Sequence, residues 1–248
     1  MNVVYILWLR QLKRYIRSKP RIIGALGQPL LFLLAFGFGF GSIFQRAGQG
    51  NYIQFLAPGV IAMTVLFSSI FSGIELIWDR QFGFLKETLV APVPRILIMV
   101  GRTLGGATVG LIQGLIVVVI CLATGFRVNN FSALPMAFLF MALTALMFTA
   151  LGTAVASLLS DFQGFQLIMN FLVMPIFFLS GALFPLTNVP RPLAIMAALD
   201  PLSYGVDGLR QSLTGAVHFG MATDLTVLSA LTAAMLLLGG YLFSKIQL

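Results

Sequence analysis

The residues best able to do chemistry lie between positions 75 and 95, in the stretch ELIWDRQFGFLKETLVAPVPR. Six charged residues stand there, between two long apolar segments. A helix over residues 80–90 would place Phe82, Leu85 and Leu89 on one side and Glu87 on the other. This pattern is typical of two structures: a solvated loop helix held by local ion pairs, or a contact surface for another protein.

Catalytic and metal-binding patterns do not occur in the sequence. It has no G-x-x-x-x-G-K-[ST] loop for nucleotide phosphates and no G-x-S-x-G nucleophile elbow. The single histidine, His218, has no metal-ligand companions nearby, and the single cysteine, Cys121, lies in an apolar run. We therefore expect this chain to be no enzyme, to bind no metal and to carry no cofactor of its own.

The composition is that of a membrane protein. Of the 248 residues, 59% are hydrophobic and 9% charged, whereas soluble domains carry about 25% charged residues. The mean hydropathy is +1.00. The length allows about six spans of roughly 20 residues with modest loops, so we expect no separate soluble domain. The net charge of +8 gathers at the ends of apolar runs, a pattern that indicates membrane orientation and no nucleic-acid partner.

The uncharged runs predict six membrane-spanning helices, each able to cross about 30 Å of hydrocarbon. They cover residues 22–44, 52–74, 103–125, 133–159, 165–183 and 225–243. The predicted fold is an all-α integral membrane protein, a single transmembrane domain over residues 1–248. Small residues recur at helical spacing in the third run, which predicts close approach of neighbouring helices there: Gly101, Gly105, Gly106, Gly110 and Gly114.

Two further segments flank the spans. Residues 1–20 have a helical period with Arg10, Lys13, Arg14 and Arg17 opposite an apolar face, which predicts an interfacial amphipathic helix in the lipid bilayer surface. A helix lying against a partner protein fits the same pattern. Residues 184–222 are too long for a turn and too apolar for a solvated loop, so we expect outer re-entrant helices. On such a helix Asp207 and Arg210 are spaced to form an ion pair.

The basic residues also predict the orientation. With the N-terminus inside, the inner segments hold eleven lysines and arginines and the outer segments hold four. This asymmetry predicts a multi-pass protein of the cytoplasmic (inner) membrane with both termini in the cytoplasm.

Two stretches resemble a known family. WDRQFGFLKETLVAPVPR resembles the segment between the second and third spans of type-2 ABC exporter permeases, the class of multidrug, daunorubicin-type and polysaccharide exporters. FLSGALFPLTNVPRPLAIMAALDPLSYGVDGLRQ resembles the motif after the fifth span of that family. With the amphipathic N-terminus and six spans, the resemblance covers essentially the whole chain.

The resemblance implies a cytoplasmic coupling helix at residues 80–91, seated in a separate ABC ATPase subunit that binds ATP and Mg. Glu87 would contact that subunit, with Arg80 and Lys86 beside it. Phe82, Leu85 and Leu89 would hold the helix against the bundle. Glu75, at the inner end of the second span, would belong to a polar layer that relays motion.

The resemblance further implies a second permease copy, in a homodimer or a heterodimer, with a pathway lined by the second and fifth spans. Asn170 and Phe171 are the pathway candidates. The expected function is that of the transmembrane permease of an ATP-driven exporter, which moves a hydrophobic or amphipathic substrate (drug, lipid or glycan) out of the cytoplasm. A self-contained secondary transporter or channel is the alternative.

Overall fold

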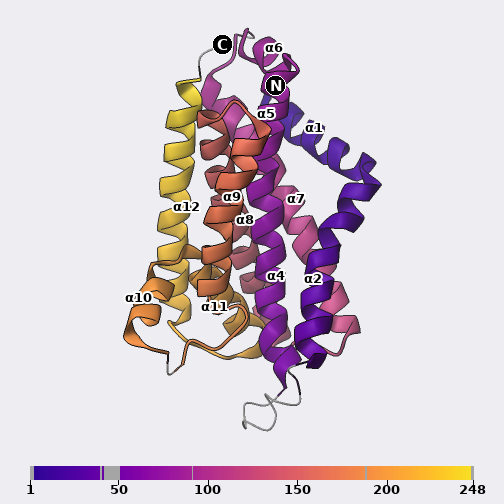
Figure 1. Cartoon of the computed structure of the whole chain (residues 1–248), viewed down its shortest axis with the longest axis vertical. Helices are drawn as coiled ribbons and strands as arrows, with labels where there is room; N and C mark the ends of the chain where they lie inside the picture. Colours follow the sequence, from indigo (N-terminus) through magenta and orange to yellow (C-terminus); the bar gives the residue numbers. More distant parts are fainter. Residues whose placement is uncertain (1–2, 40, 42–50, 91, 188, 247–248) are drawn as a thin grey trace.

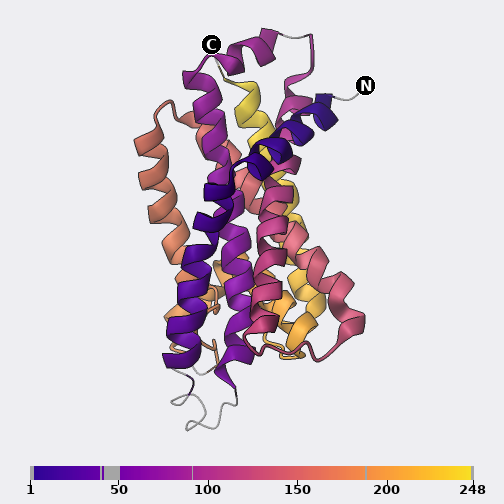
Figure 2. The same ribbon diagram turned by 90° about the vertical axis from the view of Figure 1, so that its right-hand side faces the viewer.

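The computed structural model describes residues 3–39, 41, 51–90, 92–187 and 189–246. All regular structure in these ranges is helical, which confirms the all-α prediction. Both chain ends lie at one end of an elongated bundle, which we call the proximal end (Figure 1). The connections 124–130 and 215–220 lie at the opposite, distal end, as the turned view also shows (Figure 2).

Thirteen helical elements are described along these ranges. In chain order they are α1 (Val3–Arg17), α2 (Lys19–Gly39), α4 (Tyr52–Ile70), the short η1 (Phe71–Gly73), α5 (Ile74–Gln81), α6 (Phe84–Val90), α7 (Arg95–Ala123), the short η2 (Phe131–Ala133), α8 (Leu134–Leu158), α9 (Phe162–Leu179), α10 (Arg191–Leu199), α11 (Pro201–Thr214) and α12 (Met221–Ser244).

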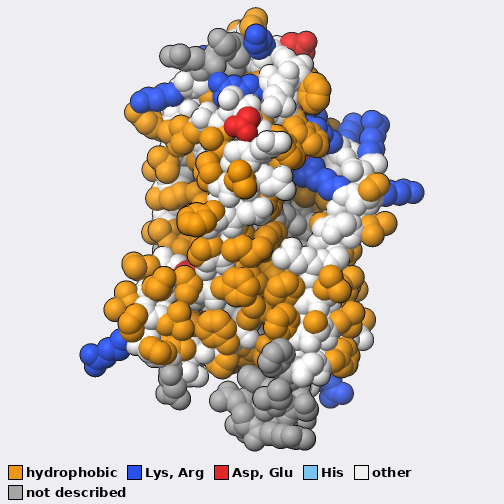
Figure 3. Space-filling view, viewed as in Figure 1, with side chains coloured by type: hydrophobic (Ala, Val, Ile, Leu, Met, Phe, Trp, Pro, Cys, Tyr) orange, Lys and Arg blue, Asp and Glu red, His pale blue; other side chains and the backbone are white. Residues whose placement is uncertain are grey.

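Six of these segments are long and apolar enough to span a membrane, as predicted. They are α2, the continuous rod of α4, η1 and α5, then α7, η2 with α8, α9, and α12. In Figure 3 hydrophobic side chains cover most of the visible face, while lysines and arginines gather toward the proximal end and over the bend between α1 and α2.

Several span ends differ from the prediction; the second span, for example, continues to Gln81, past the predicted end at residue 74. The third span begins at Arg95, eight residues before the predicted start at residue 103, because Pro94 starts the helix and Arg102 is buried inside the bundle. The first span begins at Lys19; residues 40 and 42–44 of its predicted end lie outside the described residues. A charge at a span end is tolerated where another helix supplies its partner.

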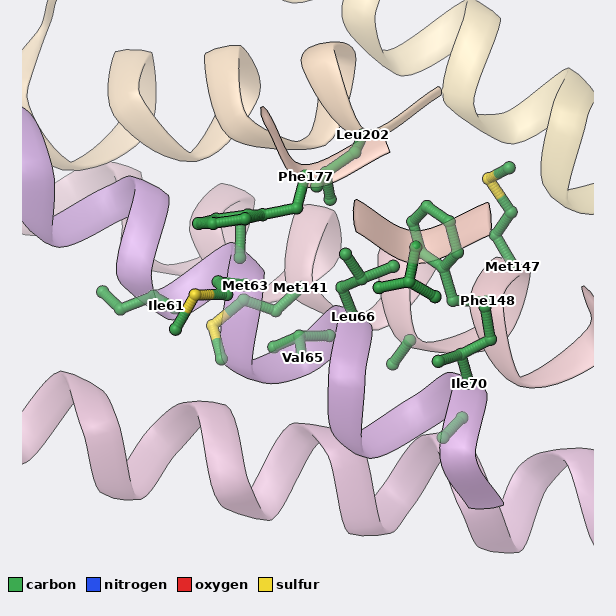
Figure 4. Packing of buried hydrophobic residues seen from close by; sticks show 14 of the residues in the cluster. Ile61, Met63, Val65, Leu66, Ile70, Met141, Met147, Phe148, Phe177 and Leu202 are labelled. Carbon is green, nitrogen blue, oxygen red and sulfur yellow. The ribbon is translucent and has the colours of Figure 1, made fainter. Parts of the chain in front are cut away.

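The α4 helix is the centre of the bundle. Most of its side chains are buried, whereas α2, α9 and α12 bury only a minority of theirs. Figure 4 shows Ile61, Met63, Val65, Leu66 and Ile70 of α4 packed between residues of α8, Phe177 of α9 and Leu202 of α11. Such packing gains mainly from van der Waals contact in a membrane, since lipid tails are as apolar as the side chains they replace.

The glycines of α7 allow two neighbouring elements to pack closely against it, which confirms the predicted close approach of helices. A methyl group at Gly101 or Gly105 would meet Leu7 or Gln11 of α1. On another face, Gly106, Gly110 and Gly114 lie against Ser72, Ser69 and Val65 of the α4–η1 rod, with Thr149 and Met141 of α8 beside them. These glycines therefore hold α1 on one side of α7 and the central rod on the other.

The predicted outer segment contains two short helices, α10 and α11, at the distal end. Asp200 caps α11 through a bond from the N–H of Leu202, and α11 ends where Gly215 adopts a left-handed φ of +83°. Most of α11 is buried against α8, α12 and α4. This helix therefore belongs to the packed bundle.

Candidate functional site

The charged stretch that opened the sequence analysis folds as a corner at the proximal end. The predicted single helix over residues 80–91 is wrong: α5 ends at Gln81, and Gly83 adopts a φ of +79° before α6 begins at Phe84. A left-handed residue cannot continue a right-handed helix, and glycine adopts that conformation without steric cost. Ala91 lies outside the described residues.

The side chains of this corner point in different directions. Phe82, expected to pack on the bundle, is 83% exposed, because the break at Gly83 turns it away. Leu85 is fully buried, as expected. Lys86 and Glu87 are exposed on α6, where a partner protein could contact them. The side chain of Leu89 lies outside the described part of the structure.

Two side chains of α5 form hydrogen bonds with the segment that connects α8 to α9. Arg80 donates a hydrogen bond to the carbonyl of Leu159 (3.3 Å), and Gln81 donates one to the carbonyl of Ser160 (3.4 Å). Arg80 was predicted to contact a partner; in this structure at least part of its guanidinium serves the bundle instead.

Two buried carboxylates on α5 form the centre of the site. Glu75 and Asp79 stand one helical turn apart and are 5% and 6% exposed. Glu75 accepts hydrogen bonds from Arg21 of α2 and from Gln11 of α1, the latter at 3.2 Å. Glu75 was predicted to lie in a polar layer that relays motion; polar groups of α1 and α2 do surround it, and the relay stays a prediction.

Asp79 is the second member of this cluster. It accepts hydrogen bonds from Arg102 of α7 and from Arg10 of α1, the latter at 3.1 Å. Arg14 of α1 lies 3.8 Å from Asp79 and 3.9 Å from Glu75. Four arginines from three helices thus surround two carboxylates on a fourth; we call these six residues the carboxylate–arginine cluster.

The cluster connects elements that are far apart in sequence. Burying a charge is unfavourable unless it is paired, so removing one member leaves its partner uncompensated in a poorly hydrated site. A movement of α5 must therefore either carry α1, α2 and α7 with it or exchange ion-pair partners. Sequence reasoning missed Asp79 and Arg102; the available signal was the spacing of four between Glu75 and Asp79.

The α1 helix uses its cationic face mainly for this site. Arg10 stacks over the ring of Phe84 on α6, 3.6 Å from its centroid, and Arg14 lies 5.4 Å from the ring of Trp78 on α5. On the other side of α1, the indole of Trp8 donates to Thr108 of α7 (2.9 Å). The helix therefore bridges the central rod and α7.

A groove of about 930 Å³ lies between α1 and the α5–α6 corner. Cations and aromatic rings share its wall, a combination suited to an acidic and partly apolar protein surface. The residues of this basic groove that bear on the argument are Arg10, Lys13, Arg14, Arg17, Phe82 and Phe84.

The predicted pathway residues, Asn170 and Phe171, lie on the open side of α9. Both are exposed in the single chain, Phe171 to 84%. That face is open to lipid or to a second copy of the chain.

The predicted ion pair between Asp207 and Arg210 is wrong. The carboxylate of Asp207 accepts the backbone N–H groups of His218 (3.0 Å) and Phe219 (2.7 Å). Arg210 donates to the carbonyl of Gly181 (2.9 Å) and stacks over Phe55 at 4.1 Å. Both side chains are buried. Each binds backbone groups that would otherwise lack hydrogen-bond partners, instead of binding the other.

Within the described ranges, no group of three or more histidine, cysteine, aspartate or glutamate side chains is placed to hold a metal ion.

At the distal end, the carboxyl group of Asp200 has a shifted pKa. Burial raises this pKa to about 8, although the hydrogen bond from the N–H of Leu202 acts in the opposite direction. The ordinary role of Asp200 is the helix cap described above.

Comparisons with known proteins agree with one another. The ABC-2 type transporter family matches residues 2–214. The transport permease ycf38 of Cyanophora paradoxa is 32% identical over 206 residues, 79% of this chain and 70% of that protein. Nodulation protein J of Rhizobium leguminosarum bv. trifolii is 30% identical over 200 residues, 78% and 74% of the two chains. The inner membrane transport permease YadH of Escherichia coli is 26% identical over 235 residues, 94% and 91% of the two chains. With six membrane-spanning helices and this match over most of its length, the chain belongs to the ABC-2 type transporter family of multi-pass membrane permeases.

Proposed function

We propose that the chain is the transmembrane permease subunit of an ATP-driven exporter and that a separate ABC ATPase subunit binds ATP and Mg. The family supports the permease, and the lack of a phosphate-binding loop in the sequence supports a separate motor. The apolar spans suit a hydrophobic or amphipathic substrate such as a drug, a lipid or a glycan. The excess of basic residues at the proximal end supports a cytoplasmic position for that end and for both termini.

The observation that carries the proposal is the α5–α6 corner. Phe82 stands 83% exposed at its tip, with exposed Lys86 and Glu87 on the following helix and the basic groove beside it. An exposed aromatic residue ringed by charges is typical of the anchor of a protein interface. We propose that the ATPase subunit receives this corner.

The carboxylate–arginine cluster would pass the motion on. When ATP brings two motor subunits together, the corner moves, and α5 moves with it. Because Glu75 and Asp79 bind arginines of α1, α2 and α7, these helices would either follow or re-pair into a second arrangement. Transport in one direction requires that the two arrangements differ in affinity for the substrate.

A second permease copy would complete the pathway. The exposed face of α9 with Asn170 and Phe171 supports its placement there, next to the central rod. Homodimer and heterodimer are both compatible with this face.

The test begins with purification of the tagged chain from its own membranes in mild detergent. We expect a stoichiometric subunit with a nucleotide-binding loop to copurify. Phe82→Asp should reduce its recovery at least tenfold, and the charge reversal Glu87→Lys should lower both its recovery and substrate-stimulated ATP hydrolysis. Phe131→Asp is the matched control, since Phe131 is also exposed (73%) but lies at the distal end.

The alternative, a self-contained secondary transporter or channel, makes the opposite prediction. The chain alone would then move a solute in liposomes along an ion gradient without ATP, and Phe82→Asp would not change the rate. That result would contradict the exporter proposal.

A further inference from the structure

A cavity of about 270 Å³ lies inside the bundle between α1, α2, α4 and α7, deeper than the carboxylate–arginine cluster. We call it the α2 slot. It reaches from Arg21 at the start of α2 to Pro29 and Met63. The slot shares no residue with the basic groove or with the exposed face of α9 that we propose for the second permease copy.

Gln113, a residue that lines the slot, carries a buried polar atom without a partner. Gln113 of α7 is 1% exposed; its amide nitrogen donates to the hydroxyl of Tyr15 and to the carbonyl of Ile22. Its amide oxygen receives no hydrogen bond from any described residue. A buried carbonyl oxygen without a donor is unfavourable, and in a predominantly apolar span a ligand hydroxyl would satisfy it.

Positive charge exceeds negative charge at the end of the slot where Arg21 lies. The carboxylate–arginine cluster holds four arginines against two carboxylates, and Arg21 both belongs to it and lines the slot. A guanidinium carries five N–H groups, so the bond from Arg21 to Glu75 leaves donors for another acceptor. A phosphate would match that geometry and neutralise part of the excess charge.

The position of the slot suggests where the ligand comes from. Arg21 follows Arg17 and Lys19 at the bend between α1 and α2, the level at which the apolar span begins. Basic residues at this depth meet the phosphates of anionic lipids. Gln28 and Gly24, which line the slot on the α2 side, are exposed, so the slot opens along the outside of the bundle.

We propose that the α2 slot binds the polyol-phosphate head group of an anionic membrane lipid, with the phosphate on Arg21 and a head-group hydroxyl donating to the amide oxygen of Gln113. The volume suits a head group rather than a whole lipid, so the acyl chains remain in the bilayer. Phosphatidylglycerol has the required charge and hydroxyl groups. Phosphatidylcholine has neither a net charge nor a hydroxyl donor.

The experiment uses native mass spectrometry of the purified, full-length chain titrated with defined lipids. We expect phosphatidylglycerol to bind at least tenfold more tightly than phosphatidylcholine, with one molecule per chain. Gln113→Leu should reduce that preference about tenfold. The matched control is Gln211→Leu, because the Gln211 amide oxygen is also buried without a donor but lies on α11 at the distal end.

A second pair of variants keeps the test valid if Gln113→Leu fails to fold. A side chain at Gly24 would meet no atom within 4 Å, so Gly24→Leu should project into the slot and block it without disturbing the core. Gly27 has the same open surroundings but does not line the slot, so Gly27→Leu should bind lipid normally. Equal binding by both leucine variants, or equal binding of the two lipids, would overturn the proposal.

The remaining comparison separates the lipid from a soluble ligand of the same chemistry. Glycerol 3-phosphate carries the phosphate and the hydroxyls without acyl chains. If it displaces phosphatidylglycerol at an equal concentration, the slot serves a soluble polyol phosphate and the lipid assignment is wrong. We expect it to compete only at concentrations at least a hundredfold higher.

Discussion

The two ends of the bundle bury charges in different ways. At the proximal end, Glu75 and Asp79 are satisfied by side chains from three other helices. At the distal end, Asp207 and Arg210 are satisfied mainly by backbone N–H and carbonyl groups of neighbouring turns. Side-chain pairs can exchange partners when helices move, whereas bonds to backbone groups fix one arrangement of a turn. The comparison indicates a proximal end built for rearrangement and a distal end built for rigidity.

The largest effect should follow from breaking a proximal pair. Asp79→Ala leaves the guanidinium of Arg102, itself 5% exposed, without its closest carboxylate, and should lower the free energy of unfolding by about 3–5 kcal/mol. Thermal unfolding in detergent measures it. Asp161→Ala also removes a carboxylate but only an exposed helix cap, so it should cost about 1 kcal/mol. Equal losses would mean that the cluster is too hydrated to matter.

A smaller and more local effect is expected at the distal end. Asp207→Ala removes the acceptor for the N–H groups of His218 and Phe219 and should lower the free energy of unfolding by about 2 kcal/mol. Hydrogen exchange should rise mainly over residues 215–219. Asp207→Asn retains an acceptor oxygen and should recover part of the loss. Increased exchange at the proximal end as well would contradict the separation of the two ends.

The shape of the cation should matter at the proximal end. Arg10→Lys keeps the positive charge but loses the flat guanidinium that stacks on Phe84 and forks onto Asp79. We expect a loss of about 1 kcal/mol in unfolding free energy, measured in the same assay. Lys13→Arg, a change of similar chemistry on the same helix, should have no measurable effect. If Arg10→Lys is neutral too, only charge matters at this contact.

The last expected effect, similar in size to that of Arg10→Lys, is a pH dependence of the distal end. Burial raises the pKa of Asp200 to about 8 from an ordinary 3.8, so the folded chain holds a proton there that the unfolded chain releases. Stability from this group is fully present below about pH 4 and is lost as the pH rises through about 8. Between pH 6.5 and 7.5 the loss is at most about 1.4 kcal/mol. Asp200→Asn keeps the cap and should reduce the slope of the melting temperature against pH over that window; an unchanged slope would assign the dependence to other groups.

The sequence predicted the architecture better than it predicted the contacts of charged side chains. Apolar runs identify spans because the bilayer sets their length, and the glycine spacing of α7 correctly indicated close packing. The partners of Asp79 could not be read from sequence, because Arg10 and Arg102 reach it only through the tertiary fold. Local spacing gave a wrong prediction for Asp207 and Arg210, which stand three positions apart on one helix but each bind backbone groups instead. The helix break at Gly83 could have been predicted from the glycine itself. The helical periodicity of residues 80–90 instead favoured one continuous helix.

The two tryptophans of the chain have a practical consequence. Trp8 lies on α1 against Thr108, and Trp78 lies on α5, stacked with Phe162 at 6.1 Å. Both belong to the proximal half, and the distal helices have none. Intrinsic fluorescence of the unlabelled protein will therefore report on one end only. Replacing either indole by phenylalanine separates the signal of the amphipathic helix from that of the central rod, so the motion of each can be followed in real time without attached dyes.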